Sequence, residues 1–141
     1  MTDRWLKVIA RQLGPETSYR LLGDWGLFRF TPNTYISFSI PFSGILLNII
    51  IILLIIGIIY YIFTLILDKN KRISSHSDWK ITIILLTIVL FGAISNIQDR
   101  LLYGYVVDYL ELKYFTVFNI ADIMISVSTI ILIVRTLRTK K

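Results

Sequence analysis

Carboxylate and amide side chains gather in the C-terminal half of the chain, beside long apolar segments. Asp122 lies within residues 115–134, a run of twenty residues that is otherwise almost entirely apolar. A carboxylate in such a segment costs a few kcal/mol to insert into a bilayer, so it usually serves a function. The other polar residues of this group are Asn96, Asp99, Arg100, Asp108 and Asn119. Because they lie near the ends of two apolar segments, they predict acid–base chemistry at a membrane surface.

Two carboxylates of this group could hydrolyse a bond together. In a poorly solvated site they do not both ionise cheaply, so one holds a proton near neutral pH while the other stays charged. Such a pair can activate a water molecule and protonate a leaving group without a metal or a covalent intermediate. The residues alone do not rank Asp99 against Asp108 as the partner of Asp122. An ion pair with Arg100 at a helix end is an equal interpretation of Asp99, and a solvated loop acid is the default for Asp108.

Composition predicts an integral membrane protein. The chain has 141 residues, 55% of them hydrophobic, and a mean hydropathy of +0.71. Residues 45–67, 80–98 and 115–134 are each long enough to cross about 30 Å of hydrocarbon as a helix. Their many isoleucines would favour strands in water, but isolated strands in lipid leave backbone groups unpaired. We therefore expect an all-α membrane protein with three transmembrane helices.

Charge placement predicts the topology and argues against nucleic-acid binding. The formal net charge is +6, but basic residues concentrate in residues 68–80 and in the C-terminal tail, which flank apolar runs. Such flanking charges favour the cytoplasmic side and contact with membrane lipid. Residues 1–44 and 99–114 are then extracytoplasmic. At about 1.5 Å per residue, Asp122 would lie about 10 Å below the outer entrance of its helix.

The sequence predicts neither a metal site nor a cofactor. It has no cysteine and one histidine, His76, in a polar loop. A single histidine without further ligands makes a zinc site improbable. The sequence also lacks a glycine-rich phosphate-binding loop.

The first 44 residues predict a short helix-like segment followed by a small β-like segment. Residues 1–13 are weakly amphipathic and end at Gly14 and Pro15. Residues 27–30 and 35–40 alternate in the manner of strands. We expect this small sheet to lie on the membrane surface. Its residues suited to the interface are Trp25, Phe28 and Tyr35. The whole chain, residues 1–141, is predicted to be one domain.

Three motifs resemble signal peptidase II, the prolipoprotein signal peptidase of bacteria. They are GAISNIQDR at residues 92–100, GYVVD at 104–108 and VFNIAD at 117–122. Their order and their spacing fit the family, and three motifs together are highly specific. A weaker match is PNTYISFS at residues 32–39, where Tyr35 and Ser37 stand for the family's Gly and Ala. The resemblance covers nearly the whole chain.

The resemblance implies an aspartic endopeptidase with Asp108 and Asp122 as the catalytic pair. It also implies residues that orient the pair or hold the substrate: Asn33, Asn96, Asp99, Arg100 and Asn119. The implied substrate is a prolipoprotein whose cysteine carries diacylglyceryl, with cleavage just before that cysteine. The implied location is the bacterial cytoplasmic (inner) membrane, with the active site on its extracytoplasmic side. We expect a monomer.

Two departures from the family pattern affect this interpretation. The family has four spanning helices, and its first carries an Asp-Gln…Lys motif. That Asp-Gln is absent here, and we expect the family's acidic residue near Arg4 to be missing with it. Residues 4–6 are similar to the end of that motif, so we expect the family's first helix to be encoded upstream of Met1 and the 141-residue form to have little activity. The segment between Asp108 and Asp122 is also short.

Two other functions stay open at this stage. The chain could be a catalytically impaired or truncated relative that binds lipidated peptides without cutting them. It could also be a small transporter or channel subunit that uses Asp122 as an ion or proton site.

Overall fold

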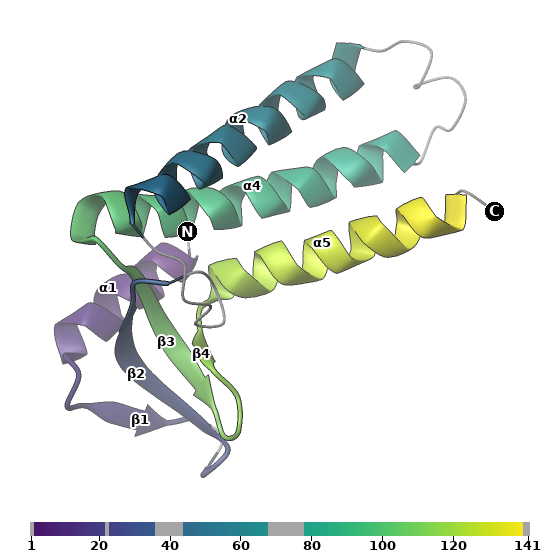
Figure 1. Cartoon of the computed structure of the whole chain (residues 1–141). Helices are drawn as coiled ribbons and strands as arrows, with labels where there is room; N and C mark the ends of the chain where they lie inside the picture. The colour runs from purple at the N-terminus through teal and green to yellow at the C-terminus, as the bar shows by residue number, and fades with distance from the viewer. Residues whose placement is uncertain (1, 22, 36–43, 68–77, 140–141) are drawn as a thin grey trace.

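A computed structural model shows three long helices with a small sheet at one end (Figure 1). The structure describes residues 2–21, 23–35, 44–67 and 78–139. The helices are α1 (Thr2–Leu13), α2 (Ile45–Leu67), α4 (Asp78–Tyr103) and α5 (Ile120–Thr139). The strands are β1 (Ser18–Arg20), β2 (Gly26–Asn33), β3 (Val106–Leu112) and β4 (Val117–Phe118).

Three helices are long and apolar enough to span a membrane, which confirms the predicted fold class. They are α2, α4 and α5, and α4 lies between the other two (Figure 1). The bounds of α2 coincide with the expected 45–67. α4 is longer than the expected 80–98 because its polar last turns, through Tyr103, stay helical. Polar side chains there find partners inside the protein, so the helix need not end where the apolar run ends.

The third spanning helix begins five residues later than predicted, at Ile120 instead of residue 115. Residues 117–118 form β4 and Asn119 caps the helix. Hydropathy does not separate a short apolar strand from a helix, so the apolar run was assigned wholly to the helix. Asp122 therefore lies in the first turn of α5, and the predicted depth of seven residues is wrong.

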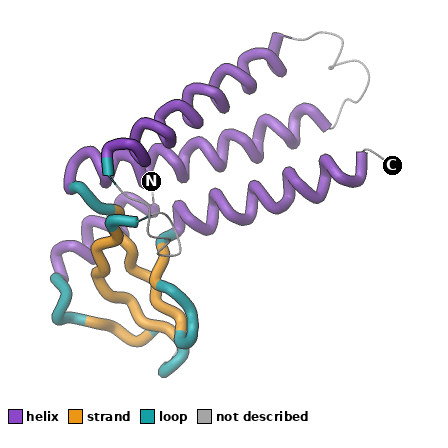
Figure 2. Tube along the Cα trace, in the orientation of Figure 1, coloured by secondary structure: helices purple, strands orange, loops and turns teal. Residues whose placement is uncertain are grey.

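The sheet is antiparallel with the strand order β1-β2-β3-β4 (Figure 2). The predicted strand at residues 27–30 is part of β2, whereas residues 36–40 of the second predicted strand lie outside the described part of the chain. β3 replaces the loop expected around Asp108, because Gly104, at φ 81°, ends α4 and turns the chain back.

One face of the sheet packs on α1. Ala10, Phe28, Val107 and Tyr109 form a buried cluster there, and the rings of Phe28 and Tyr109 lie 5.5 Å apart. Phe28 is therefore a core residue, and its predicted interfacial position is wrong. Trp25 is 65% exposed, as an interfacial residue would be.

A register shift in the sheet and a glycine in α4 affect how the elements with the polar residues pack. The β2–β3 register shifts between Phe28 and Thr31, after which Thr31 pairs with Asp108; such bulges re-aim side chains. In α4, a Cβ on Gly92 would come within 2.8 Å of the carbonyl oxygen of Ala121. The glycine thus lets α4 and α5 approach closely near the start of α5.

Candidate active site

Asn119 connects the two carboxylates that the sequence singles out. Its side-chain Nδ2 donates to Asp108 Oδ1 at 2.6 Å, and its backbone N–H donates to Asp122 Oδ2 at 3.4 Å. Asp108 lies on β3 and is 1% exposed, whereas Asp122 lies on α5 and is 4% exposed. One residue between strand and helix therefore places both carboxylates in the same buried site.

A reciprocal capping arrangement fixes the orientation of Asp122. Asn119 Oδ1 accepts the backbone N–H of Asp122 at 2.9 Å, while the Asp122 carboxylate accepts the backbone N–H of Asn119. This is the geometry of a capping box, in which the N-cap residue and the third helical residue satisfy each other's backbone N–H groups. The helix start also favours negative charge, so the ionised form of Asp122 is well placed.

Two further amides hold the carboxylates from the other side. Asn96 on α4 donates from Nδ2 to Asp122 Oδ1 at 2.9 Å. Asn33, at the end of β2, donates from Nδ2 to Asp108 Oδ2 at 2.9 Å. Each carboxylate is thus held by Asn119, between β4 and α5, and by one further amide, from β2 for Asp108 and from α4 for Asp122.

Asp99 anchors the supporting network. It is fully buried and forms ion pairs with Arg4 and, at 2.9 Å, with Lys7. Its Oδ2 also accepts the backbone N–H of Val107 at 3.1 Å, which ties α4 to the start of β3. The ion pair considered between Asp99 and Arg100 is not what the described residues show. Asp99 pairs with α1 because α1 packs across the end of α4 and brings two cations to it.

Lys7 links the partners of Asp99 to the carboxylate pair. The side chain is fully buried, and Nζ donates to Asn96 Oδ1 at 2.8 Å. That contact leaves the Nδ2 of Asn96 facing Asp122. An unbroken series of contacts therefore runs from Asp99 through Lys7 and Asn96 to Asp122.

Asp3 is a member of this cluster that the sequence reasoning missed. Its Oδ2 lies 3.3 Å from Lys7 Nζ and accepts the Ser95 hydroxyl at 2.5 Å. Its Oδ1 accepts the Tyr109 hydroxyl at 2.8 Å. The expectation that an acidic residue near Arg4 is missing is therefore wrong, since Asp3 precedes it and pairs with Lys7. The i,i+4 spacing of Asp3 and Lys7 in a helix was the signal that could have found them.

Arg100 contacts the segment after β2. Its guanidinium donates to the backbone carbonyl of Tyr35 at 2.5 Å. The backbone N–H of Tyr35 donates in turn to Asn33 Oδ1 at 2.9 Å, which orients the amide that holds Asp108. Arg100 thereby supports the site through Tyr35 and Asn33.

Burial and a neighbouring charge make Asp108 a proton carrier near neutral pH. Burial, reinforced by the nearby Asp122, raises the pKa of Asp108 to about 7, although hydrogen bonds from Asn33 and Asn119 oppose the shift. Burial likewise raises the pKa of Tyr109 far above its ordinary value, so its hydroxyl stays a donor to Asp3.

The balance of charges around Asp108 and Asp122 also indicates that one of the two carboxylates is protonated. Its four carboxylates belong to Asp3, Asp99, Asp108 and Asp122, and its three cations are Arg4, Lys7 and Arg100. Four negative and three positive charges leave one excess negative charge in a poorly solvated region. One proton on the carboxylate pair removes that excess.

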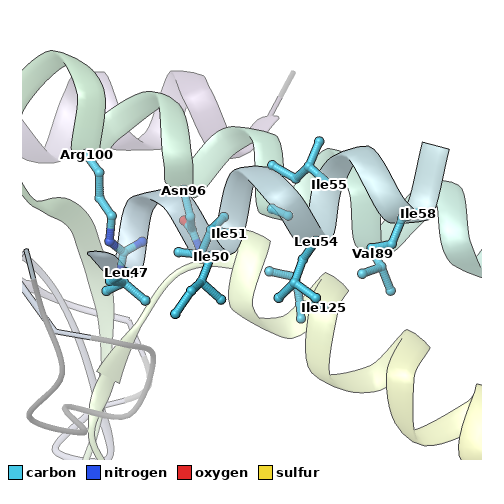
Figure 3. A pocket seen from close by; sticks show the side chains of 11 residues that line it. Leu47, Ile50, Ile51, Leu54, Ile55, Ile58, Val89, Asn96, Arg100 and Ile125 are labelled. Atoms are coloured by element: carbon cyan, nitrogen blue, oxygen red, sulfur yellow. The ribbon is translucent and has the colours of Figure 1, made fainter. Parts of the chain in front are cut away.

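An apolar cavity of about 300 Å³ leads from the middle of the helices toward this cluster (Figure 3). Its aliphatic walls come from α2, α4 and α5 and include Ile51, Leu54 and Ile125. Asn96 and Arg100 line its polar end. A second cavity of about 210 Å³ lies beside Asp108 and is lined by Asn33 and Tyr35 among others. The apolar cavity therefore reaches Asn96 and Arg100 of the cluster, and the second cavity reaches Asp108.

Within the described ranges, no group of three or more histidine, cysteine or acidic residues is arranged to hold a metal ion. The independence of metals and cofactors remains a prediction. What the arrangement offers chemically is two buried carboxylates held by Asn119, of which Asp108 has its pKa raised to about 7. Such a pair suits general acid–base catalysis.

Comparison with solved structures first defines the class of protein. The fold matches a bacterial membrane enzyme solved by the in meso method at 2.3 Å resolution, with a TM-score of 0.80 and 22% identity, over 99% of this chain and 83% of the other. The spanning helices and the sheet are thus the fold of a multi-pass membrane protein.

Sequence comparison then gives the family. The model of the signal peptidase (SPase) II family matches residues 1–138. A lipoprotein signal peptidase of Clostridium novyi (strain NT) is 31% identical over 147 residues, 99% of this chain and 92% of the relative. One from Clostridium tetani (strain Massachusetts / E88) is 34% identical over 138 residues, 94% and 83% of the two chains. The chain belongs to the signal peptidase II family, a family of membrane peptidases.

Proposed function

We propose that the protein removes signal peptides from prolipoproteins as an aspartic endopeptidase. Its substrate carries diacylglyceryl on cysteine, and cleavage falls just before that residue. The observation that carries the proposal is the bridge made by Asn119, which holds Asp108 and Asp122 in one buried site. Membership of the signal peptidase II family supports the substrate class.

The two carboxylates take different roles in the proposed hydrolysis. Asp108, with its pKa near 7, carries the shared proton, and Asp122 is the base. Asp122 accepts a proton from a water molecule while the water oxygen attacks the carbonyl carbon of the scissile bond. Asp108 donates its proton toward the carbonyl oxygen, which gives a neutral tetrahedral intermediate. Collapse breaks the C–N bond as the proton held by Asp122 passes to the leaving amine. Asp108 takes back a proton from one hydroxyl of the intermediate, which becomes the carbonyl of the product acid, so both carboxylates return to their starting states.

The surrounding amides orient Asp108 and Asp122 for the proposed proton transfers. Asn33, Asn96 and Asn119 hold both carboxylates in fixed orientations by hydrogen bonds from β2, from α4 and from the junction between β4 and α5. Preorganised donors need little rearrangement while charge moves in the reaction, which lowers the barrier. These residues act through the carboxylates, as positioning residues.

The location of the site suits a substrate that is itself in the membrane. Asp108 lies on β3 and Asp122 in the first turn of α5. Figure 1 shows that these two elements belong to the end of the molecule where the spanning helices meet the sheet. The apolar cavity beside α2 provides room for an apolar signal segment next to Asn96. We place this end of the helices on the extracytoplasmic side of the bacterial cell membrane, because the basic residues flank the other end.

The test measures cleavage of a prolipoprotein peptide with a diacylglyceryl-modified cysteine, by the chain reconstituted in lipid vesicles. Asp108→Asn and Asp122→Asn should each lower kcat by about 10² or more, since each removes one proton-transfer role. Asp24→Asn is the matched control, because its side chain is 72% exposed in the turn between β1 and β2 and pairs with Arg20. Cleavage at the wild-type rate by either folded variant would contradict the assignment.

The same assay separates the peptidase from the two other functions. A relative that only binds lipidated peptides would retain the peptide uncut, and an ion-conducting subunit would show flux across the vesicle that depends on Asp122. The contacts favour the peptidase over the ion pathway, because both oxygens of Asp122 accept hydrogen bonds from protein groups.

A further inference from the structure

A second apolar space touches Asp122 from another side. It has a volume of about 210 Å³, and the described residues that line it are Phe115, Phe118, Asp122, Ile123, Ser126 and Val127. Four of these six side chains are purely apolar. We call this space the α5 cleft. It begins under the rings of Phe115 and Phe118, which lie 6.0 Å apart, and follows the outer end of α5.

The α5 cleft is distinct from the cavity beside α2. Successive residues of a helix are rotated by about 100°, so Ile125 points roughly 160° away from both Ile123 and Val127. Ile125 lines the cavity beside α2, whereas Ile123 and Val127 line the α5 cleft. The two apolar spaces therefore lie on opposite sides of α5, and Asp122 lies on the face between them.

The side chains of the α5 cleft are open to the surroundings of the helix. Phe115 is 58% exposed, Val127 49% and Ile123 42%. In a spanning helix such exposed apolar residues face lipid tails. A chain of the bilayer can thus enter the cleft sideways and follow α5 with one end close to Asp122.

We propose that the α5 cleft holds one acyl chain of the lipidated cysteine of the substrate. This rests on the proposed function, which places a cysteine-linked diacylglyceryl group next to the scissile bond. The substrate then needs one apolar space for its signal segment and another for its lipid, both within reach of the carboxylates. The two spaces on either side of Asp122 meet that need, and the smaller one, open to lipid, suits a single chain.

The cleft orients the substrate more than it attracts it. An acyl chain is already surrounded by hydrocarbon in the bilayer, so its transfer to an apolar cleft gains little free energy. Fixing the chain along α5 instead holds the neighbouring cysteine, and with it the scissile bond, against Asp122. Blocking the cleft should therefore lower kcat more than it raises KM.

The experiment compares Val127→Trp with Val134→Trp in vesicles. Val134 is seven residues along α5, on nearly the same face and 42% exposed, but outside the cleft. The two substrates differ only in their lipid, dipalmitoyl or diacetyl. We expect Val127→Trp to lower the ratio of kcat for the dipalmitoyl substrate to kcat for the diacetyl substrate about tenfold or more, since a misplaced chain misplaces the bond. Val134→Trp should keep the wild-type ratio, and an unchanged ratio in Val127→Trp overturns the proposal.

A second measurement detects whether an acyl chain occupies the α5 cleft, and it does not depend on cleavage. A dipalmitoyl peptide with a photoreactive group in its acyl chain is bound to Asp108→Asn and irradiated. Labels on α5 at Ile123, Ser126 or Val127 support the proposal, and labels only on α2 overturn it. Failure of the proposed function shows separately, as an Asp108→Asn variant that still cuts the substrate.

Discussion

Helices α1 and α2 bury opposite kinds of residue. α1 buries Asp3 and Lys7 while Trp5 is 66% exposed. α2 is almost wholly aliphatic, yet only 6% of its spanning window is buried inside the protein. In water the reverse would be expected, with apolar residues inside and charges outside.

The contrast shows what holds this fold together. Apolar residues gain little by leaving lipid for the protein interior, so α2 can expose them. Charged residues near a membrane gain most by pairing, so α1 turns them inward to Ser95, Asn96 and Asp99. The polar cluster is therefore tightly specified by its contacts, whereas α2 forms one wall of the apolar cavity.

The largest loss of stability is expected when the buried cation of α1, Lys7, is removed. Lys7→Met leaves Asp3 without its cation and Asp99 with Arg4 alone, and it removes a partner of Asn96. Loss of one partner of a buried ion pair costs about 3–5 kcal/mol, so the free energy of unfolding should fall by that order. Titration with a denaturing detergent measures it.

Arg4→Met is the control for this variant. The Arg4 side chain is 29% exposed, so water screens its ion pair with Asp99 and the loss should be clearly smaller. If the free energy of unfolding fell equally in the two variants, burial of Lys7 would not explain its contribution to stability.

The close approach of α4 and α5 is the next most sensitive point. Gly92→Ala places a methyl group within 2.8 Å of Ala121 O and of the Ile125 side chain. Overpacking of this kind costs about 1–3 kcal/mol. Because Asn96 lies one turn further along α4, the shift should also weaken its hydrogen bond to Asp122 and lower kcat.

Gly57→Ala on α2 is the matched comparison, since nothing lies within 4 Å of its added Cβ. Thermal unfolding in detergent should show a lower Tm for the first variant only. A similar loss in both would point to a general effect of helix glycines.

The pH dependence of cleavage should reflect the shared proton. Asp108 has a raised pKa of about 7, so the pair keeps its proton below that pH and loses it above. The log of kcat should therefore fall with a slope approaching one per pH unit, about tenfold from pH 7.5 to pH 8.5, as the acid form disappears. A kcat that stays constant to pH 9 would show that Asp108 does not supply a proton.

The smallest effect is expected on the lipid-facing side of α2. Leu53 is 61% exposed, so Leu53→Ala should change the free energy of unfolding by less than about 0.5 kcal/mol. The detergent titration used for Lys7→Met provides the comparison. A loss above 1 kcal/mol, on the scale of ordinary destabilising substitutions, would mean that α2 is packed against something in the membrane.

Periodicity and hydropathy predicted the spanning helices well and the sheet poorly. The uninterrupted run of α2 needs no partner to be recognised, whereas β3 owes its existence to pairing with β2 across more than seventy residues of sequence. Strand propensity depends on such partners, so Val106–Leu112 could not be identified as a strand from its own residues. The start of α5 was misplaced for the same reason, because β4 is a strand only beside β3.

The sequence by itself determined which residue types must find partners. Carboxylates within apolar segments are too costly to leave unpaired near lipid, so Asp122 could be singled out without a structure. Asp108 was distinguished from Asp99 only by the resemblance of the three motifs to a known family. Only the tertiary structure decided what each one does. It brings Arg4 and Lys7 to Asp99, and it sets Asn119 between the other two carboxylates. Partner choice depends on distances across the fold, and a linear order of residues does not contain those distances.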